Sequence, residues 1–178
     1  RAEKVFDYSA KEDVIHTEII VPEHAPVWAS ERQMLWNKVE AVEKRKDAQL
    51  ARDIIAALPR ELDRDQQIAL LREFVEANFV AKGMIADVAI HDKLASDGGT
   101  NPHAHIMLTL RDVDAAGFGK KNRDWNKLDL VSHWRNAWEQ VTNHYLEAFG
   151  RQERVSLQRL DVQGIDRTPE RHMGVEAW

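Results

Sequence analysis

Two histidines separated by one residue, His103 and His105, are the side chains of this chain best placed to do chemistry. They lie in residues 101–108, whose alternation of apolar and polar residues indicates a β-strand. Side chains alternate between the two faces of a strand, so both imidazoles point to the same face. Neutral imidazole binds zinc, manganese, nickel or copper, so the pair is a candidate metal site.

A third histidine, His91, ends an apolar run at residues 84–90 that indicates a second strand. The segment between the two runs contains Gly98-Gly99 and indicates a loop. If this loop joins two antiparallel strands, His91 lies near His103 and three imidazoles converge. Three protein ligands leave coordination positions open, as in catalytic metal sites. The alternative is that the histidines only cap the strand ends and bond to the loop.

Asp87 lies four residues before His91 on the same expected strand face. A carboxylate in that place can orient a metal-binding imidazole from behind, and we expect Asp87 to do so. The alternative is an ordinary ion pair with a surface cation.

The composition excludes several other kinds of site. The chain has 178 residues, enough for one domain with a real core, and no cysteine. Disulfides, thiolate zinc sites and cysteine nucleophiles are therefore excluded, and the composition is compatible with a reducing compartment. No apolar run approaches the roughly 20 residues of a membrane span.

The net charge of −5 argues against binding nucleic acid through overall charge. A DNA contact would have to be local, and Lys120, Lys121 and Arg123 form the candidate cluster. The alternative is a solvated loop.

The apolar spacing predicts an α+β fold with an antiparallel central sheet and helices packed on one face, because both histidine strands have one apolar face. Ser30 and Gln33 have capping-box spacing, so we expect a helix there that continues or re-forms until Pro59. Asp63 and Gln66 have the same spacing ahead of the next helix. The other expected elements are a strand at residues 14–21, a polar connection at 112–127, a helix through 131–145 and a short strand at 155–157.

The histidine motif resembles the metal site of the MobA/MobL relaxases, which are plasmid mobilisation proteins of the HUH endonuclease superfamily. The likeness extends through most of the chain and is greatest to the TraA-type relaxases of large conjugative plasmids. The blocks that carry it are Ala89-Ile90-His91, residues 101–109, His16-Thr17-Glu18-Ile19, Leu35-Trp36-Asn37, residues 57–62, residues 117–120, Trp134-Arg135, Gln163-Gly164-Ile165 and His172-Met173-Gly174.

The resemblance implies a single relaxase domain over residues 1–178 with an HUH-endonuclease-like fold. It implies that His91, His103 and His105 hold a divalent ion, magnesium or manganese, at the scissile phosphate of single-stranded DNA at an origin of transfer. A tyrosine hydroxyl attacks that phosphate and leaves a 5′-phosphotyrosyl link and a free 3′-OH. The expected partners are this DNA and other relaxosome and conjugation proteins, and the expected location is the bacterial cytoplasm.

The family's nucleophilic tyrosine lies near the N-terminus, so we expect it upstream of Arg1 and expect the chain as given to be inactive alone. Tyr8 resembles a different family tyrosine. Ile55 stands where many relatives carry a glutamate, which puts an auxiliary carboxylate in doubt.

Two alternatives remain open. One is a replication-initiator nuclease of the same superfamily. Tyr145 is placed like its nucleophile, but Phe149 replaces the expected lysine and Tyr145 lies in the apolar register of a helix. The other alternative is a DNA-binding module without chemistry.

Overall fold

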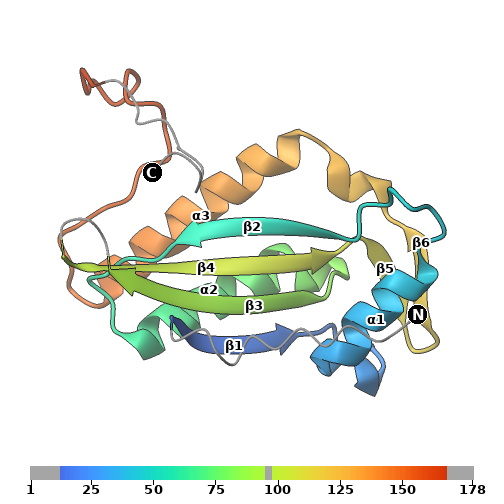
Figure 1. The fold of residues 1–178 in the computed structure, drawn as a ribbon. Helices are drawn as coiled ribbons and strands as arrows, with labels where there is room; N and C mark the ends of the chain where they lie inside the picture. The colour runs from blue at the N-terminus through green and yellow to red at the C-terminus, as the bar shows by residue number, and fades with distance from the viewer. Residues whose placement is uncertain (1–12, 95–97, 168–178) are drawn as a thin grey trace.

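The computed structural model describes residues 13–94 and 98–167 and has the expected α+β fold (Figure 1). The strands are β1 (Val14–Ile20), β2 (Ala51–Ala57), β3 (Ala86–Leu94), β4 (Thr100–Thr109), β5 (Arg111–Asp114) and β6 (Gly117–Lys121). The helices are α1 (Arg32–Val42), α2 (Arg64–Asn78) and α3 (Asp129–Ala148), with short 3-10 helices η1 (Val27–Ser30), η2 (Val80–Lys82) and η3 (Arg123–Asn126).

Four strands form the central sheet, in the order β1-β3-β4-β2, and each neighbouring pair is antiparallel. The expected antiparallel pairing of the two histidine strands is confirmed, with His91 directly opposite His103. Strands β5 and β6 form a separate hairpin at the other end of β4 (Figure 1).

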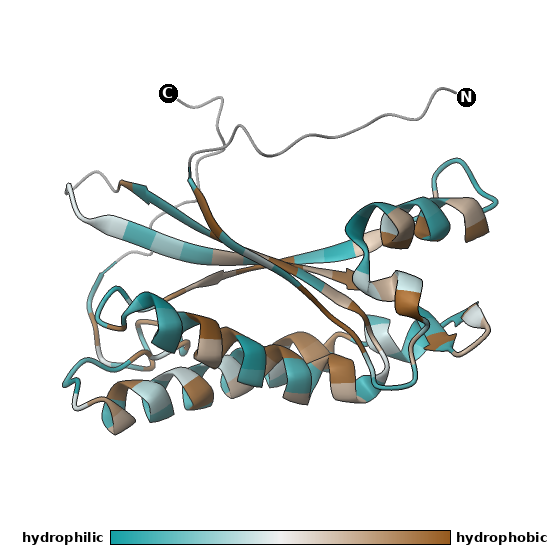
Figure 2. Ribbon diagram, turned by 90° about the horizontal axis from the view of Figure 1, so that it is seen from below, coloured by the Kyte–Doolittle hydropathy of each residue, from teal (hydrophilic) through white to brown (hydrophobic). Residues whose placement is uncertain are grey.

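Helices α2 and α3 lie on one side of the sheet (Figure 2). The inward residues of β3, Ala86, Val88 and Ile90, are at most 1% exposed and share a core with Phe74 and Trp138. Strand alternation places every second residue on the opposite face, where the histidines lie. Helix α1 packs on that face near the hairpin, where Arg32 and Trp36 bond to Asp87 (Figure 2). Among the described residues no helix covers the histidine end of this face, which we call the open face.

A second, smaller core joins α1 to the end of the sheet near the hairpin. Leu35 and Val39 of α1 pack there with Ile85 and Val113. The hairpin and α1 therefore lie together at the end of the sheet away from the histidines (Figure 1).

The predicted capping box at α2 is confirmed, because Asp63 and Gln66 each accept a backbone hydrogen bond from the other. The capping box predicted for α1 is wrong. Glu31 is the N-cap and accepts from the backbone of Met34 at 2.9 Å. The Ser30 hydroxyl instead donates to the carbonyl oxygen of Val27, within η1, at 2.8 Å.

The helix expected to reach Pro59 ends at Val42, and residues 51–57 form strand β2 instead. The spacing of the apolar residues in this segment is compatible with either a helix or a strand. Pairing with β4 over seven residues decides the outcome, because Ile54 and Ala56 turn to the core while Asp53 and Ile55 face the histidine side.

The polar connection expected at residues 112–127 contains most of the β5–β6 hairpin and η3. The pairing of β5 with β6 depends on a turn at Gly117, whose φ of +125° suits glycine. The strand expected at residues 155–157 is wrong, because no strand forms there. The helix expected after residue 131 is confirmed as α3.

Candidate functional site

Three histidine side chains meet on the open face of the sheet. His91 lies opposite His103, and His105 follows two residues later on the same strand face. The ring centroids are 5.5 Å apart for His91 and His103, 5.0 Å for His91 and His105, and 5.5 Å for His103 and His105. The structure thus brings these side chains together, as the strand pairing predicts.

Asp13, the residue before β1, orients the ring of His91. Its Oδ2 lies 3.1 Å from Nδ1 of His91 and 3.1 Å from Nζ of Lys93. The hydrogen bond with His91, and then the one with Lys93, lowers the pKa of Asp13 to about 2. Asp13 is therefore ionised at neutral pH and fixes which nitrogen of His91 faces it.

The other two rings also have an oxygen near Nδ1. In His103 that nitrogen lies 2.9 Å from the backbone carbonyl oxygen of Asn101. In His105 it lies 3.5 Å from Oδ2 of Asp53, which is 49% exposed on the neighbouring strand β2. All three rings therefore keep Nε2 as the nitrogen available to a ligand.

The donor set fits a divalent ion. Metal-binding histidines commonly use one ring nitrogen for a carboxylate or carbonyl and the other for the metal, which is the pattern seen here. Within residues 13–94 and 98–167, no group of three or more histidine, cysteine or acidic side chains has the geometry to hold an ion as it stands. The rings are gathered but not closed on one point, so metal binding stays a prediction.

Asp87 does not orient an imidazole, so that prediction is wrong. Its carboxylate accepts hydrogen bonds from Arg32 at 2.7–3.1 Å and from the indole nitrogen of Trp36 at 2.8 Å. Four residues along a strand separate it from His91 by about 13 Å. Asp87 is 8% exposed and ties α1 to the sheet.

Among the described residues, the carboxylates that contact the three histidines are Asp13 and Asp53, and neither was predicted from the sequence. Asp13 is adjacent to Val14, the residue paired with His91, and Asp53 lies in a segment expected to be helical. Recognising the alternation of residues 51–57 as a strand would have placed Asp53 on the histidine face.

Tyr145 lies in the helix layer, across the sheet from the histidines. Its hydroxyl donates to Glu73 at 3.0 Å, and its ring packs against the main core. Partial burial, with a further effect from Glu73, raises the pKa of Tyr145. Both location and pKa make it a poor nucleophile at this site. Tyr8 and His172 lie outside the described residues.

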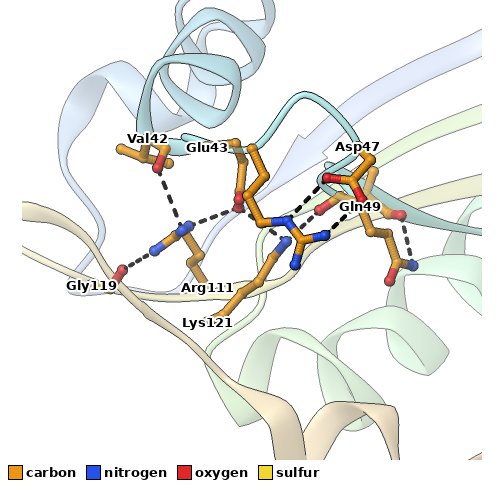
Figure 3. Close-up of polar contacts among 9 residues, drawn as sticks. Val42, Glu43, Asp47, Gln49, Arg111, Gly119 and Lys121 are labelled. Atoms are coloured by element: carbon orange, nitrogen blue, oxygen red, sulfur yellow. Dashed lines mark hydrogen bonds and ion pairs between the residues drawn. The ribbon is translucent and has the colours of Figure 1, made fainter.

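The predicted basic cluster lies on strand β6 of the hairpin, with Lys120 and Lys121, and at the start of η3, with Arg123, and its three cations differ. Lys121 is tied down: its Nζ lies 3.2 Å from Glu43 and donates to the Gln49 carbonyl at 2.7 Å (Figure 3). Lys120 and Arg123 are exposed. Only these last two present their charge freely to a ligand.

Glu43 is the centre of the polar network in Figure 3. The guanidinium of Arg111 donates to it at 3.0 Å and also to the Gly119 carbonyl at 2.8 Å. Burial by itself would raise the pKa of Glu43, but the hydrogen bonds from Arg111 and Lys121 outweigh it, and the pKa is lowered. This network joins the end of α1 to the hairpin.

Residues 1–178 match the model of the family described as MobA/MobL. A "Conjugal transfer protein TraA" of Agrobacterium fabrum is 38% identical over 99% of this chain. A "Mobilization protein MobL" of Acidithiobacillus ferridurans is 32% identical over 97% of it. The chain spans 18% of the first of these relatives and 53% of the second.

A solved structure described as "Molecular Basis of Vancomycin Resistance Transfer in Staphylococcus aureus" has a similar fold. The TM-score is 0.77 at 40% sequence identity, and the match covers 86% of this chain and 79% of that one. No helix in the described part of the chain is long and apolar enough to cross a membrane.

Proposed function

Because the chain belongs to the MobA/MobL family, we propose that it is the DNA-processing domain of a conjugative relaxase. In this proposal it binds single-stranded DNA at a plasmid's origin of transfer, where one strand is nicked and later rejoined. The observation that supports it most is the histidine cluster, in which each ring has an oxygen on Nδ1 and Nε2 left for an ion.

We place a divalent ion, magnesium or manganese, on His91, His103 and His105. When bound, such an ion stabilises negative charge on a phosphate oxygen. The chain's own residues prepare the site for it. Asp13 and Asp53 orient two of the rings through their carboxylates and add negative charge that favours a cation.

The nucleophile in this proposal is a tyrosine upstream of Arg1, as the resemblance implies. Its oxygen forms a bond to phosphorus while the bond from phosphorus to the 3′ oxygen breaks. The tyrosine proton passes to a base, and the leaving 3′ oxygen takes up a proton from an acid or from water, so the products are a 5′-phosphotyrosyl link and a 3′-OH. The position of Tyr145 in the helix layer argues against the replication-initiator alternative.

Lys120 and Arg123 are proposed to contact DNA phosphates. Both are exposed on or next to the hairpin. The chain carries a net charge of −5, so such contacts must be local. Lys121 contributes to the same surface mainly by fixing the hairpin against Glu43.

Strand nicking tests the proposal directly. We expect the full-length protein to nick supercoiled plasmid carrying its own origin when magnesium or manganese is present. A His103→Ala, His105→Ala variant should lose activity on the order of 100-fold or more. His133→Ala, an exposed histidine of α3, is the matched control and should be as active as wild type. Undiminished cleavage after removal of all three histidines would end the proposal.

A metal titration of residues 1–178 separates a relaxase from a binding module without chemistry. Manganese at 100 times its Kd should raise the free energy of unfolding by about 2.7 kcal/mol. The double alanine variant should show no such rise. A wild-type chain that binds DNA but gains no stability from manganese or magnesium would favour the binding module.

A further inference from the structure

A cavity of about 790 Å³ lies beside the free edge of β2, on the side away from β4. Its other walls are α3 and the extended segment at residues 153–157. A volume in this range suits one small organic ligand or one nucleotide. The metal site proposed above does not account for this cavity.

The outer wall of the cavity is held in place by one stripe of α3. Asn143 accepts from and donates to the backbone of Val155, both at 2.8 Å. One turn earlier, Glu139 accepts from the Leu157 nitrogen at 2.7 Å, and two turns earlier Arg135 donates to the Leu157 carbonyl at 3.1 Å. The segment is thus fixed along the helix without being a strand, and a space remains between it and β2.

The floor of the cavity is aromatic. Trp134 and Trp138 line it together with Phe74, and all three belong to the main core. Such a floor accepts a flat, apolar group, and base contacts with aromatic side chains tolerate any sequence.

Two cations on the walls have no carboxylate partner. The guanidinium of Arg52 lies 5.2 Å from the centre of the Trp134 ring and donates to the Trp125 carbonyl at 2.6 Å. Among the residues that the structure describes, neither Arg52 nor Arg135 has an acidic group within 4.0 Å. Guanidinium groups with only neutral partners are suited to bind a phosphate.

The acidic residues that line the cavity are Asp53, Glu61 and Glu153. Asp53 is directed to His105 on the other face of the sheet. Glu153 is exposed at the rim and Glu61 is half-buried. The charge next to the aromatic floor is therefore positive.

We propose that this cavity binds one nucleotide of single-stranded DNA next to the histidine site, with its phosphate on Arg52 and Arg135 and its base on the aromatic floor. Only β2 separates the two places: Ile55 lines the cavity and is paired with His105. The aromatic floor lies on the helix side of the sheet, so a strand of DNA that crosses the histidines must turn round the free edge of β2 to reach it. The inference rests on the proposed function.

Photocrosslinking tests where a base lies. The probe is a 12-residue thymidine oligonucleotide carrying one 5-bromodeoxyuridine, irradiated with residues 1–178. We expect crosslinked peptides that contain Trp134 or Trp138, or residues 153–157. Crosslinks confined to the open face of the sheet or to the hairpin would overturn the inference and leave the proposed function intact. A chain that binds no oligonucleotide, with or without manganese, would overturn both.

Salt dependence tests the phosphate contact. Arg135→Gln should weaken binding of the thymidine oligonucleotide by about 3- to 10-fold and reduce the slope of log K against log salt by about 0.7. Lys82→Gln removes an exposed cation that does not line the cavity and should change neither. Equal effects of the two variants on affinity and on the salt slope would overturn the proposed contact between Arg135 and a DNA phosphate.

A competition experiment separates DNA from a free nucleotide. Thymidine monophosphate at millimolar concentration should leave the crosslink to the α3 peptide largely intact, because the DNA strand is also held elsewhere. Full suppression at micromolar concentration would overturn the assignment to DNA, since it would identify a site for free nucleotides.

Discussion

The two ends of the central sheet carry polar clusters of opposite design. At the hairpin end, Glu43 is 10% exposed and meets both Arg111 and Lys121, so the three charged groups are paired within the fold (Figure 3). At the other end, three imidazoles gather around one another and keep Nε2 for a ligand. The first cluster is complete by itself, and the second is the one that we propose binds a metal ion.

This difference separates a contribution to stability from a contribution to function. A matched buried cluster loses stability when one member is removed, because charges are left without partners. A cluster built for a ligand loses binding and keeps most of its stability. Variants at the two ends should therefore fail in different assays.

The largest expected loss of stability follows from Glu43→Ala. Arg111 and Lys121 would remain close together without their carboxylate, at 21% and 32% side-chain exposure. Allowing for that exposure, we expect a loss of about 2 kcal/mol in the free energy of unfolding, measured by urea titration. Asp47→Ala is the matched control: it breaks the exposed pair with Arg45 and should leave the free energy of unfolding nearly unchanged. Equal losses would show that Glu43 is not a buried anchor.

The same anchor predicts a pH dependence. The pKa of Glu43 is lowered in the folded chain, so its contribution is fully present above the ordinary glutamate pKa of 4.5. It is lost as the pH falls through the lowered value. The stability difference between wild type and Glu43→Gln should thus be largest near neutral pH and shrink below pH 4.5. A difference that grows in acid would contradict this assignment.

At the histidine end, Asp13→Asn should weaken manganese binding by about tenfold, because a neutral amide orients His91 less well. Isothermal titration calorimetry measures this loss. Asp87→Asn gives the reverse result: it breaks the contacts with Arg32 and Trp36, lowers stability and leaves metal affinity unchanged. A loss of metal affinity in Asp87→Asn and none in Asp13→Asn would restore the expectation drawn from the sequence.

The sequence was enough to place the three histidines, because their meeting depends on two strands joined by one loop. Alternation fixes the face and the antiparallel pairing brings His91 opposite His103. Their carboxylate partners were not predictable in this way. Asp13 reaches His91 only because β1 lies beside β3. This strand order is set by packing between segments that are distant in the sequence, so the contact could not be predicted from local pattern.

Two errors have related causes. Residues 51–57 have apolar spacing that suits a helix or a strand, and only pairing with β4 decides between them. Asp87 has the spacing expected of a partner for His91, but Arg32, 55 residues earlier, takes it instead. Local pattern therefore brought the three histidines together correctly, while tertiary contacts determined which acidic groups lie beside them.

The smallest expected effects on stability and DNA binding distinguish Lys120 from Lys121, two adjacent lysines of the hairpin that the sequence alone does not distinguish. Lys121 is held by Glu43 and the Gln49 carbonyl, so Lys121→Met should cost about 1 kcal/mol in unfolding free energy. Lys120 is exposed, and Lys120→Met should cost less than about 0.5 kcal/mol. In DNA binding the order reverses: Lys120→Met should reduce the salt slope for single-stranded DNA by about 0.7, and Lys121→Met should change it less. If both variants reduced the slope equally and neither lost stability, the hairpin would be a mobile basic loop, and the matched cluster at Glu43 would not form in solution.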